Sequence, residues 1–230
     1  MLVLAIDTAT PAVTTGLVQL DAVAGPRTLA ERVTVNARAH GELLTPHVQA
    51  VLAEADVRLG DVDAVVCGAG PGPFTGLRVG LVTAAALGHA LDRPVYPVAT
   101  PDAIAWEVFR AGGEGAELLV VTDARRREVY WARYDTTGAR VDGPNVERPA
   151  DLAARLAGMV VRRAVGQGAE LYADVLGLPV AAPSFPSPAG LVGAAAEALL
   201  SHARPGPLTP LYLRRPDAVE PGARKRVSQA

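Results

Sequence analysis

The sequence contains a single cysteine and few aromatic residues. Because Cys67 has no second cysteine to pair with and lies in an apolar stretch, we expect a buried thiol that packs as a small hydrophobic residue. Aromatic residues make up 4% of a chain that is 50% apolar, so the core has to consist mostly of Ala, Val and Leu. The net charge of −2 argues against a dense cationic face for tight nucleic-acid binding, but it permits a weak RNA contact inside a larger complex.

Metal-binding and nucleophilic patterns are also missing. The four histidines are scattered along the chain: His40, His47, His89 and His202. The first two would lie roughly 10 Å apart along a helix, which is too far for both to bind one ion. Without a cysteine pair or an H-x-x-x-H motif we expect no metal site, and we expect His40 to cap a helix or to pair with Glu42. No G-x-S-x-G motif supports a serine hydrolase.

The apolar stretches do not predict membrane insertion. The chain begins MLVLAIDTAT, where no basic residue precedes the apolar run and an aspartate follows it, unlike in a signal peptide. The longest weakly polar stretch, residues 79–91, has about 13 residues, whereas a spanning helix needs about 20. We therefore expect a soluble, cytoplasmic protein without a membrane contact.

The first hundred residues follow an α/β pattern. Apolar or alternating runs predict strands at residues 2–6, 13–20, 29–35, 62–67 and 95–98. Helical periodicity predicts helices at residues 39–55 and 75–91. This order of strands and helices indicates a mixed sheet, and a duplicated plan of β-meander and helices would suit the whole chain.

A second unit is expected after Thr100-Pro101. The predicted elements are a helix at 102–110, strands at 117–122 and 128–134, a proline-rich linker at 179–188, a helix at 189–203 and a strand-like segment at 211–213. The helix after the linker is expected to return to the first unit. We therefore divide the chain into a first subdomain of residues 1–100 plus 187–204, a smaller second subdomain of residues 101–186 and a partly disordered tail of residues 205–230.

The first predicted strand ends in Ile6-Asp7-Thr8-Ala9-Thr10. In the actin-like ATPase fold an aspartate followed by small hydroxyl residues forms the first phosphate loop, whose turn needs glycine so that backbone N–H groups approach phosphate oxygens. Here Ala9 takes the glycine position. Two interpretations remain open: either Asp7, Thr8 and Thr10 lie near a nucleotide, or Asp7 caps N–H groups at a strand-to-turn junction. No second glycine-rich phosphate grip is present, so independent ATP hydrolysis is not expected.

A glycine- and proline-rich loop, residues 68–78, leads into the second predicted helix. Thr75 is expected to be the N-cap, so that free N–H groups would face a ligand. The Gly-Lys-Ser/Thr ending of a P-loop is missing, and two prolines remove donors that a phosphate cradle uses. The loop is therefore either a rigid connection or a binding element, with five candidate residues: Gly70, Gly72, Phe74, Thr75 and Arg78.

The two predicted helices of the first subdomain carry candidate interface residues. The first helix has an apolar face of Leu44, Val48, Val51, Leu52 and Ala55. The second has a stripe of small residues at every fourth position: Gly76, Gly80, Ala84 and Gly88. Since glycine disfavours a helix by about 1 kcal/mol, close packing has to compensate. The stripe packs either inside its own subdomain or against a partner or second copy.

Residues 123–130, Asp-Ala-Arg-Arg-Arg-Glu-Val-Tyr, place three arginines in a turn between two predicted strands. Such a turn can be a solvated charge cluster. It can also contact tRNA phosphates or an acidic partner.

Several strings together resemble the TsaB (YeaZ) family. They are LAIDTAT at the start, H-x-E-L-L-x-P from residue 40, GPGPFTGLRVG at 70–80, TPDAIA from residue 100, DARRREVYWARY at 123–134, VGQGA at 165–169 and PLYLRRPDA at 210–218. They occur in the family's order and cover nearly the whole chain. The first and third are shared in part with the catalytic relative TsaD, whereas the DAR-x-x-EVY and LYLR strings are typical of TsaB. Gly41 and Pro73 depart from the frequent family residues Ser and Gly.

The resemblance implies an actin/Hsp70/sugar-kinase-like (ASKHA) fold with a reduced second subdomain. It also implies a non-catalytic scaffold or activating subunit that binds TsaD, and through it the ATPase TsaE, for threonylcarbamoylation of adenosine 37 in ANN-decoding tRNA. The helices at 39–55 and 75–91 would bind TsaD or, without it, a second copy to form a homodimer.

The resemblance further implies only indirect tRNA contact and no cofactor of the chain's own, with ATP or ADP at the junction with TsaD. The residues leave three alternatives: an ATP-binding enzyme of the same fold, a protease-like protein, and a direct tRNA-binding module, which only residues 125–127 and the tail suggest.

Overall fold

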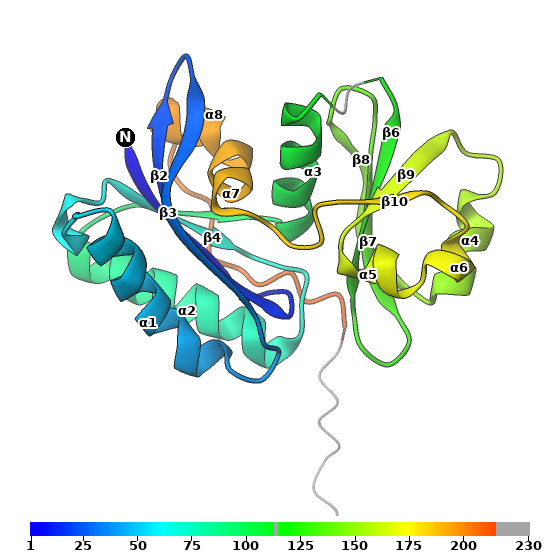
Figure 1. Cartoon of the computed structure of the whole chain (residues 1–230), viewed down its shortest axis with the longest axis horizontal. Helices are drawn as coiled ribbons and strands as arrows, with labels where there is room; N and C mark the ends of the chain where they lie inside the picture. The colour runs from blue at the N-terminus through cyan, green and yellow to red at the C-terminus, as the bar shows by residue number, and fades with distance from the viewer. Residues whose placement is uncertain (113–114, 215–230) are drawn as a thin grey trace, which may run out of the picture.

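The fold consists of two similar mixed sheets with helices between and outside them (Figure 1). This computed structural model describes residues 1–112 and 115–214. The first sheet contains β1 (Leu2–Asp7), β2 (Ala12–Asp21), β3 (Gly25–Val35), β4 (Ala64–Gly68) and β5 (Val95–Val98). Their order is β3-β2-β1-β4-β5, in which β1 to β3 form an antiparallel meander and β4 and β5 continue parallel to β1.

The second sheet repeats this topology. It contains β6 (Glu117–Asp123), β7 (Val129–Tyr134), β8 (Arg140–Glu147), β9 (Val161–Val165) and β10 (Val180–Ala181). Its order is β8-β7-β6-β9-β10, again an antiparallel meander followed by two parallel strands. The predicted mixed α/β class and the duplicated plan are thus confirmed.

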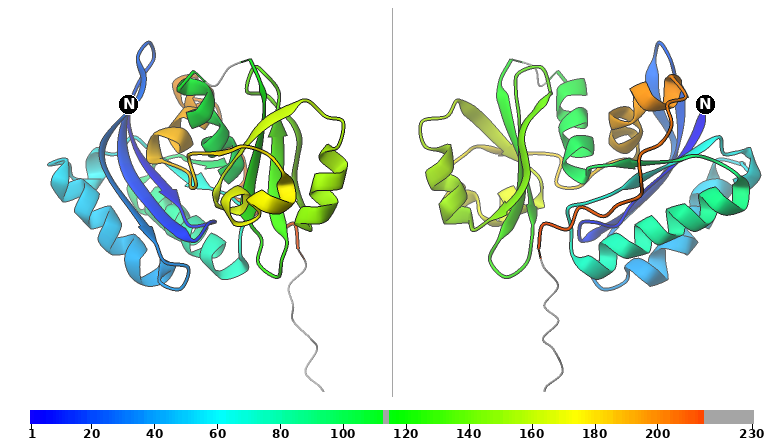
Figure 2. Two further views of the ribbon diagram at one scale, coloured as in Figure 1. Left: turned by 45° about the vertical axis from the view of Figure 1, so that its right-hand side comes forward. Right: turned by 180° about the vertical axis from the view of Figure 1, so that it is seen from behind.

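The helices form three layers around the two sheets (Figures 1 and 2). On the outer face of the first sheet lie α1 (His40–Glu54) and α2 (Phe74–Leu91). Between the sheets lie α3 (Thr100–Arg110), α7 (Pro188–Ala194) and α8 (Ala196–Leu200), and outside the second sheet lie α4 (Pro149–Leu156), α5 (Gln167–Leu171) and α6 (Ala173–Leu176). A 3-10 turn, η1 (Leu59–Asp61), precedes β4.

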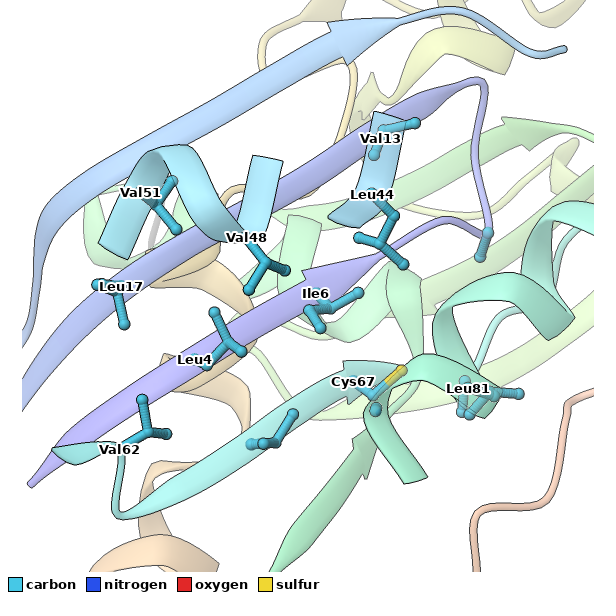
Figure 3. Close-up of a cluster of buried hydrophobic side chains, with 14 of the residues drawn as sticks. Leu4, Ile6, Val13, Leu17, Leu44, Val48, Val51, Val62, Cys67 and Leu81 are labelled. Atoms are coloured by element: carbon cyan, nitrogen blue, oxygen red, sulfur yellow. The ribbon is translucent and has the colours of Figure 1, made fainter. Parts of the chain in front are cut away.

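Strand β1 shows why its sequence is apolar on both faces. Leu4 and Ile6 point into the cluster under α1 and α2, whereas Val3 and Ala5 point into the cluster under α3, α7 and α8 (Figure 3). Because side chains alternate across a strand and both faces are covered, a central strand needs a continuous apolar run. Cys67 belongs to the first cluster and is fully buried, as expected for a packing thiol.

Three predicted elements differ from the structure. The helix at 189–203 is instead two short helices, α7 and α8, which meet at Ala195. The proline-rich linker contains β10, which pairs parallel to β9. Residues 211–213 form no strand; Leu211 N donates a hydrogen bond to Ala69 O, and Tyr212 N donates one to Pro210 O (both 2.9 Å). Residues 215–230 of the predicted tail, and the end of the PLYLRRPDA string, lie outside the described residues.

Helix α2 begins one residue before the helix predicted at residues 75–91, and it is longer than the apolar stretch 79–91. Within residues 1–112 and 115–214 it is the one helix whose length and composition alone would permit a membrane span. Its Leu77 and Ala84 are fully buried, in the cluster that covers the first sheet. One such helix is weak evidence for a membrane span, because core helices of soluble proteins have the same length and composition.

Candidate functional site

The turn between β1 and β2 is buried and held by Asp7. The Asp7 carboxylate accepts hydrogen bonds from Ala9 N (2.9 Å) and from Thr100 Oγ1 (2.6 Å), and its side chain is not exposed. Burial raises the pKa of Asp7 to about 6, although the Thr100 and Ala9 hydrogen bonds oppose the shift. This geometry agrees with the capping interpretation of Asp7.

Thr8 connects the same turn to α2. Its hydroxyl donates to Gly76 O (2.7 Å) and accepts from Gly80 N (2.9 Å). A Cβ at Gly80 would overlap the Thr8 hydroxyl, and a Cβ at Gly72 would overlap the carbonyl oxygen of Ala9. The turn is therefore in direct contact with the 68–76 loop and with α2.

The loop residues divide between structure and surface. Helix α2 begins at Phe74 after Pro73, and no side chain caps it; Thr75 is an exposed residue inside the helix, so its predicted N-cap role is wrong. Pro73 has an extended backbone (ψ 136°) and directly precedes the helix, so the first helical residue is Phe74, one position before Thr75. Gly70 has a positive φ of 91°, and Gly72 is buried, so these glycines are required by the backbone path.

The arginine-rich turn between β6 and β7 faces this loop. Arg125 N donates to Asp123 Oδ1 (2.9 Å), and the two side chains form an ion pair at 3.5 Å. Arg125, Arg126 and Arg127 have positive φ values of 64°, 54° and 61°. Arg214 donates to Ala124 O (2.8 Å) and forms an ion pair with Glu128.

The segment after α8 runs beside the first sheet and reaches this turn (Figure 2). Tyr212 stacks on Phe74 with ring centroids 4.4 Å apart, and the Arg78 guanidinium lies 3.8 Å from the Phe74 ring centre. Arg78 also donates from Nε to the Tyr212 hydroxyl (2.7 Å). Sequence analysis identified Phe74 and Arg78 but missed Tyr212 and Tyr130, because contacts between residues so distant in sequence leave no local pattern.

Two adjoining cavities lie between the loop and the arginine turn. The first, of about 340 Å³, is lined by Gly72, Pro73, Phe74, Ala124, Arg125, Arg126, Tyr130, Tyr212, Leu213 and Arg214. The second, of about 260 Å³, is lined by Thr8, Thr10, Pro11, Ala37, His40, Pro73, Phe74, Thr75, Gly76 and Arg125. They share three lining residues. We call the two together the front cleft.

Two of the four histidines make structural contacts. His40 Nε2 lies 2.8 Å from Thr10 O, and His47 Nε2 lies 3.2 Å from Thr34 Oγ1. His40 therefore bonds to the β1–β2 turn in place of the predicted pairing with Glu42. Within residues 1–112 and 115–214, no group of three or more His, Cys, Asp or Glu side chains could hold a metal ion.

The predicted interface residues are mostly interior. Leu44, Val48 and Val51 lie on the buried face of α1 (Figure 3). Leu52 is partly exposed, and the α2 stripe is buried: Gly76, Gly80, Ala84 and Gly88. The glycine stripe exists because α2 approaches Thr8 at Gly76 and Gly80, and Val95 at Gly88. These residues are thus occupied by packing within the first subdomain, and their role in an interface stays a prediction; the two helices also present other side chains that a partner could contact.

A third cavity, of about 540 Å³, lies on α3, the β7–β8 hairpin and α7–α8 and was not predicted. Tyr134 and Arg140 both donate to Asp102, with distances of 2.7 and 3.1 Å. Burial raises the pKa of Asp102 and also that of Tyr134. We call this the back cavity.

The duplicated sheets, with a β1–β2 turn whose Asp7 and Thr8 side chains are hydrogen-bonded within the chain, define an actin-like α/β protein. A putative N-acetylmannosamine kinase from Listeria monocytogenes shares this fold, with a TM-score of 0.52 at 12% identity over 88% of this chain and 100% of that chain. YeaZ from Pseudomonas aeruginosa has a TM-score of 0.75 at 29% identity, covering 92% and 99% of the two chains.

Sequence comparisons identify the family to which the chain belongs within this fold class. The family described as "TsaD: tRNA N6-adenosine threonylcarbamoyltransferase" matches residues 28–200. An uncharacterized protein from Mycobacterium tuberculosis is 54% identical over 94% of this chain and 93% of its own length. The tRNA threonylcarbamoyladenosine biosynthesis protein TsaB of Escherichia coli is 35% identical over 58% of this chain and 55% of its own length. The chain belongs to the TsaB (YeaZ) family of tRNA threonylcarbamoyladenosine biosynthesis proteins.

Proposed function

We propose that this chain is a non-catalytic scaffold subunit in the cytoplasm. It binds a TsaD-type threonylcarbamoyltransferase, and through it the ATPase TsaE, to support threonylcarbamoylation of adenosine 37 in ANN-decoding tRNA. The family assignment supports a role in tRNA threonylcarbamoyladenosine biosynthesis. The internal hydrogen bonds of Asp7 and Thr8 support a non-catalytic role.

The observation that carries this proposal is that the polar side chains of the β1–β2 turn are hydrogen-bonded within the chain. An actin-like ATPase needs N–H and hydroxyl groups that are free to bind phosphate. Here the Thr8 hydroxyl is bonded to α2 and the Asp7 carboxylate to Thr100 and Ala9. Of the three candidate nucleotide contacts, Thr8 and Thr10 line the smaller part of the front cleft, but both hydroxyls already have backbone partners.

The outer face of α1 and α2 is the surface proposed for the partner. Val82 is 66% exposed, and Ala85, Ala86 and Pro46 are also exposed. Small apolar side chains let a partner helix approach closely and leave few side chains to order on binding. A second copy would use the same face, so a homodimer and the complex with the transferase exclude each other. A shared ATP or ADP would then lie at the junction with the transferase.

The test is light-scattering chromatography of the full chain mixed with the TsaD-type protein of its organism. We expect a heterodimer for the wild type and its loss in Ala86→Arg, because a long charged side chain would separate the helices. Ala154→Arg, at an exposed position on α4, is the matched control and should still associate. No complex of the wild type at micromolar concentrations, or an intact complex of Ala86→Arg, contradicts the proposal.

The ATPase alternative is tested on the same preparation. Hydrolysis of ATP by the chain alone, lost on Thr8→Val, would overturn the non-catalytic assignment. We expect ATP hydrolysis no faster than in buffer without protein.

A further inference from the structure

The front cleft and the back cavity differ in their charges. The back cavity places Arg110 and Arg140 beside the carboxylates of Asp102 and Glu197. The front cleft contains Arg125, Arg126 and Arg214, and none of its described lining residues is Asp or Glu. Asp123 pairs with Arg125, and Glu128 pairs with Arg214, from outside the cavity lining. The lining of the front cleft therefore offers a ligand cationic groups, whereas the lining of the back cavity offers both signs of charge.

Aromatic side chains gather at the same place. Phe74, Tyr130 and Tyr212 all line the 340 Å³ cavity, although aromatics are only 4% of the sequence. The Phe74 ring holds Tyr212 in a stack with an interplanar angle of 19°, and the Arg78 bond fixes the Tyr212 hydroxyl. Tyr212 remains 38% exposed. Its ring is thus pre-oriented at the rim and can stack on another flat group.

The cleft is also longer than a single anion requires. The second cavity continues from Arg125 toward Thr10 and His40, and Phe74 borders both parts. Cationic side chains beside an aromatic platform are the elements by which proteins bind single-stranded nucleic acid, with phosphates on the arginines and bases on the rings.

We propose that the front cleft binds a nucleotide unit of single-stranded RNA, with its phosphate at Arg125 and Arg126 and its base on Tyr212. The inference rests on the proposed function, because a tRNA-modifying complex brings RNA to this chain. It gives the chain a direct RNA contact where the family resemblance implied only an indirect one. The small net charge makes this contact weak, with a Kd on the order of 10–100 µM at 50 mM salt.

The test measures fluorescence anisotropy of a labelled 12-nucleotide single-stranded RNA with the full chain. Arg125→Ala/Arg126→Ala should weaken binding at least tenfold and reduce the log–log salt slope by about 0.7, the value for one phosphate contact to a single strand. Tyr212→Ala should weaken it roughly tenfold, whereas Tyr212→Phe keeps the ring and should bind nearly as the wild type. The exposed Arg162→Ala is the matched charge control.

Competition identifies the ligand class. Displacement of the RNA by equimolar ADP or inorganic triphosphate would assign the cleft to a free nucleotide, and displacement by a poly-glutamate peptide would assign it to an acidic protein; either overturns the inference. Equal RNA binding by all variants also overturns it. The same variants are tested for association with the transferase. If the variants bind the transferase normally and bind RNA as well as the wild type does, only this inference is rejected. If the wild type does not bind the transferase, the proposed function is rejected.

Discussion

The two sheets begin with the same turn and use it differently. In each, the first strand ends in an aspartate whose carboxylate accepts the N–H of the residue two positions later: Ala9 N to Asp7 and Arg125 N to Asp123, both 2.9 Å. The first turn continues with small residues and is covered by the 68–76 loop. The second continues with three arginines, which are exposed.

The difference shows that topology fixes where a turn lies, while its side chains decide whether it faces the interior or a ligand. Threonine and alanine can be buried once each hydroxyl is bonded. Arginine is rarely buried unless it is paired, so the second turn stays open to the cleft. The first turn is therefore expected to affect stability, and the second to affect binding.

The largest expected effect comes from a substitution that disrupts the first turn. Gly72→Ala places a Cβ on the carbonyl oxygen of Ala9, where only backbone could move aside. We expect a loss of about 3 kcal/mol in the free energy of unfolding, at the upper end of overpacking effects. Chemical denaturation measures it.

Gly41→Ala is the control, because a Cβ there meets no atom within 4 Å and the residue lies in α1. It should stabilise the chain by about 0.5–1 kcal/mol. A Gly72→Ala variant as stable as this control would mean that the loop does not rest on the turn.

Much of the fold could be predicted from the sequence, because each central strand is a continuous apolar run and each long helix has a buried face. Short elements of the second subdomain were less visible; β10, with Val180 and Ala181, depends on pairing with β9 rather than on its own pattern.

The site was predicted less completely, for a physical reason. Glycines spaced by four allow close approach of any backbone, so Gly76 and Gly80 look the same whether they face a partner helix or the Thr8 turn. The stack of Phe74 and Tyr212 joins residues 138 positions apart in the sequence and has no local signal.

The next effect concerns pH. The folded-state pKa of Asp7 is raised from 3.8 to about 6, so the folded chain binds a proton more tightly than the unfolded chain does. The resulting stability is present below pH 3.8 and is lost as the pH rises through about 6, on the order of 2–3 kcal/mol in total. Asp7→Asn should remove this slope in denaturation curves measured from pH 4 to 7. A slope that survives the substitution would place its origin elsewhere.

The smallest effects compare two buried threonines, one in each sheet. The Thr8 hydroxyl bridges Gly76 O and Gly80 N, a pair that an α-helix can join directly. Thr8→Val should therefore cost about 1–2 kcal/mol, because the loss of two buried hydrogen bonds is partly repaired inside α2. Thr122 is also buried, next to Asp123, but its hydroxyl has no hydrogen-bond partner among residues 1–112 and 115–214. Thr122→Val should be neutral or stabilise by up to about 1 kcal/mol, since it removes an unpaired polar atom. Chemical denaturation of both variants gives the sign of each change. If both variants were destabilised equally, the effect of Thr8→Val would come from the burial of the threonine and not from its hydrogen bonds to α2.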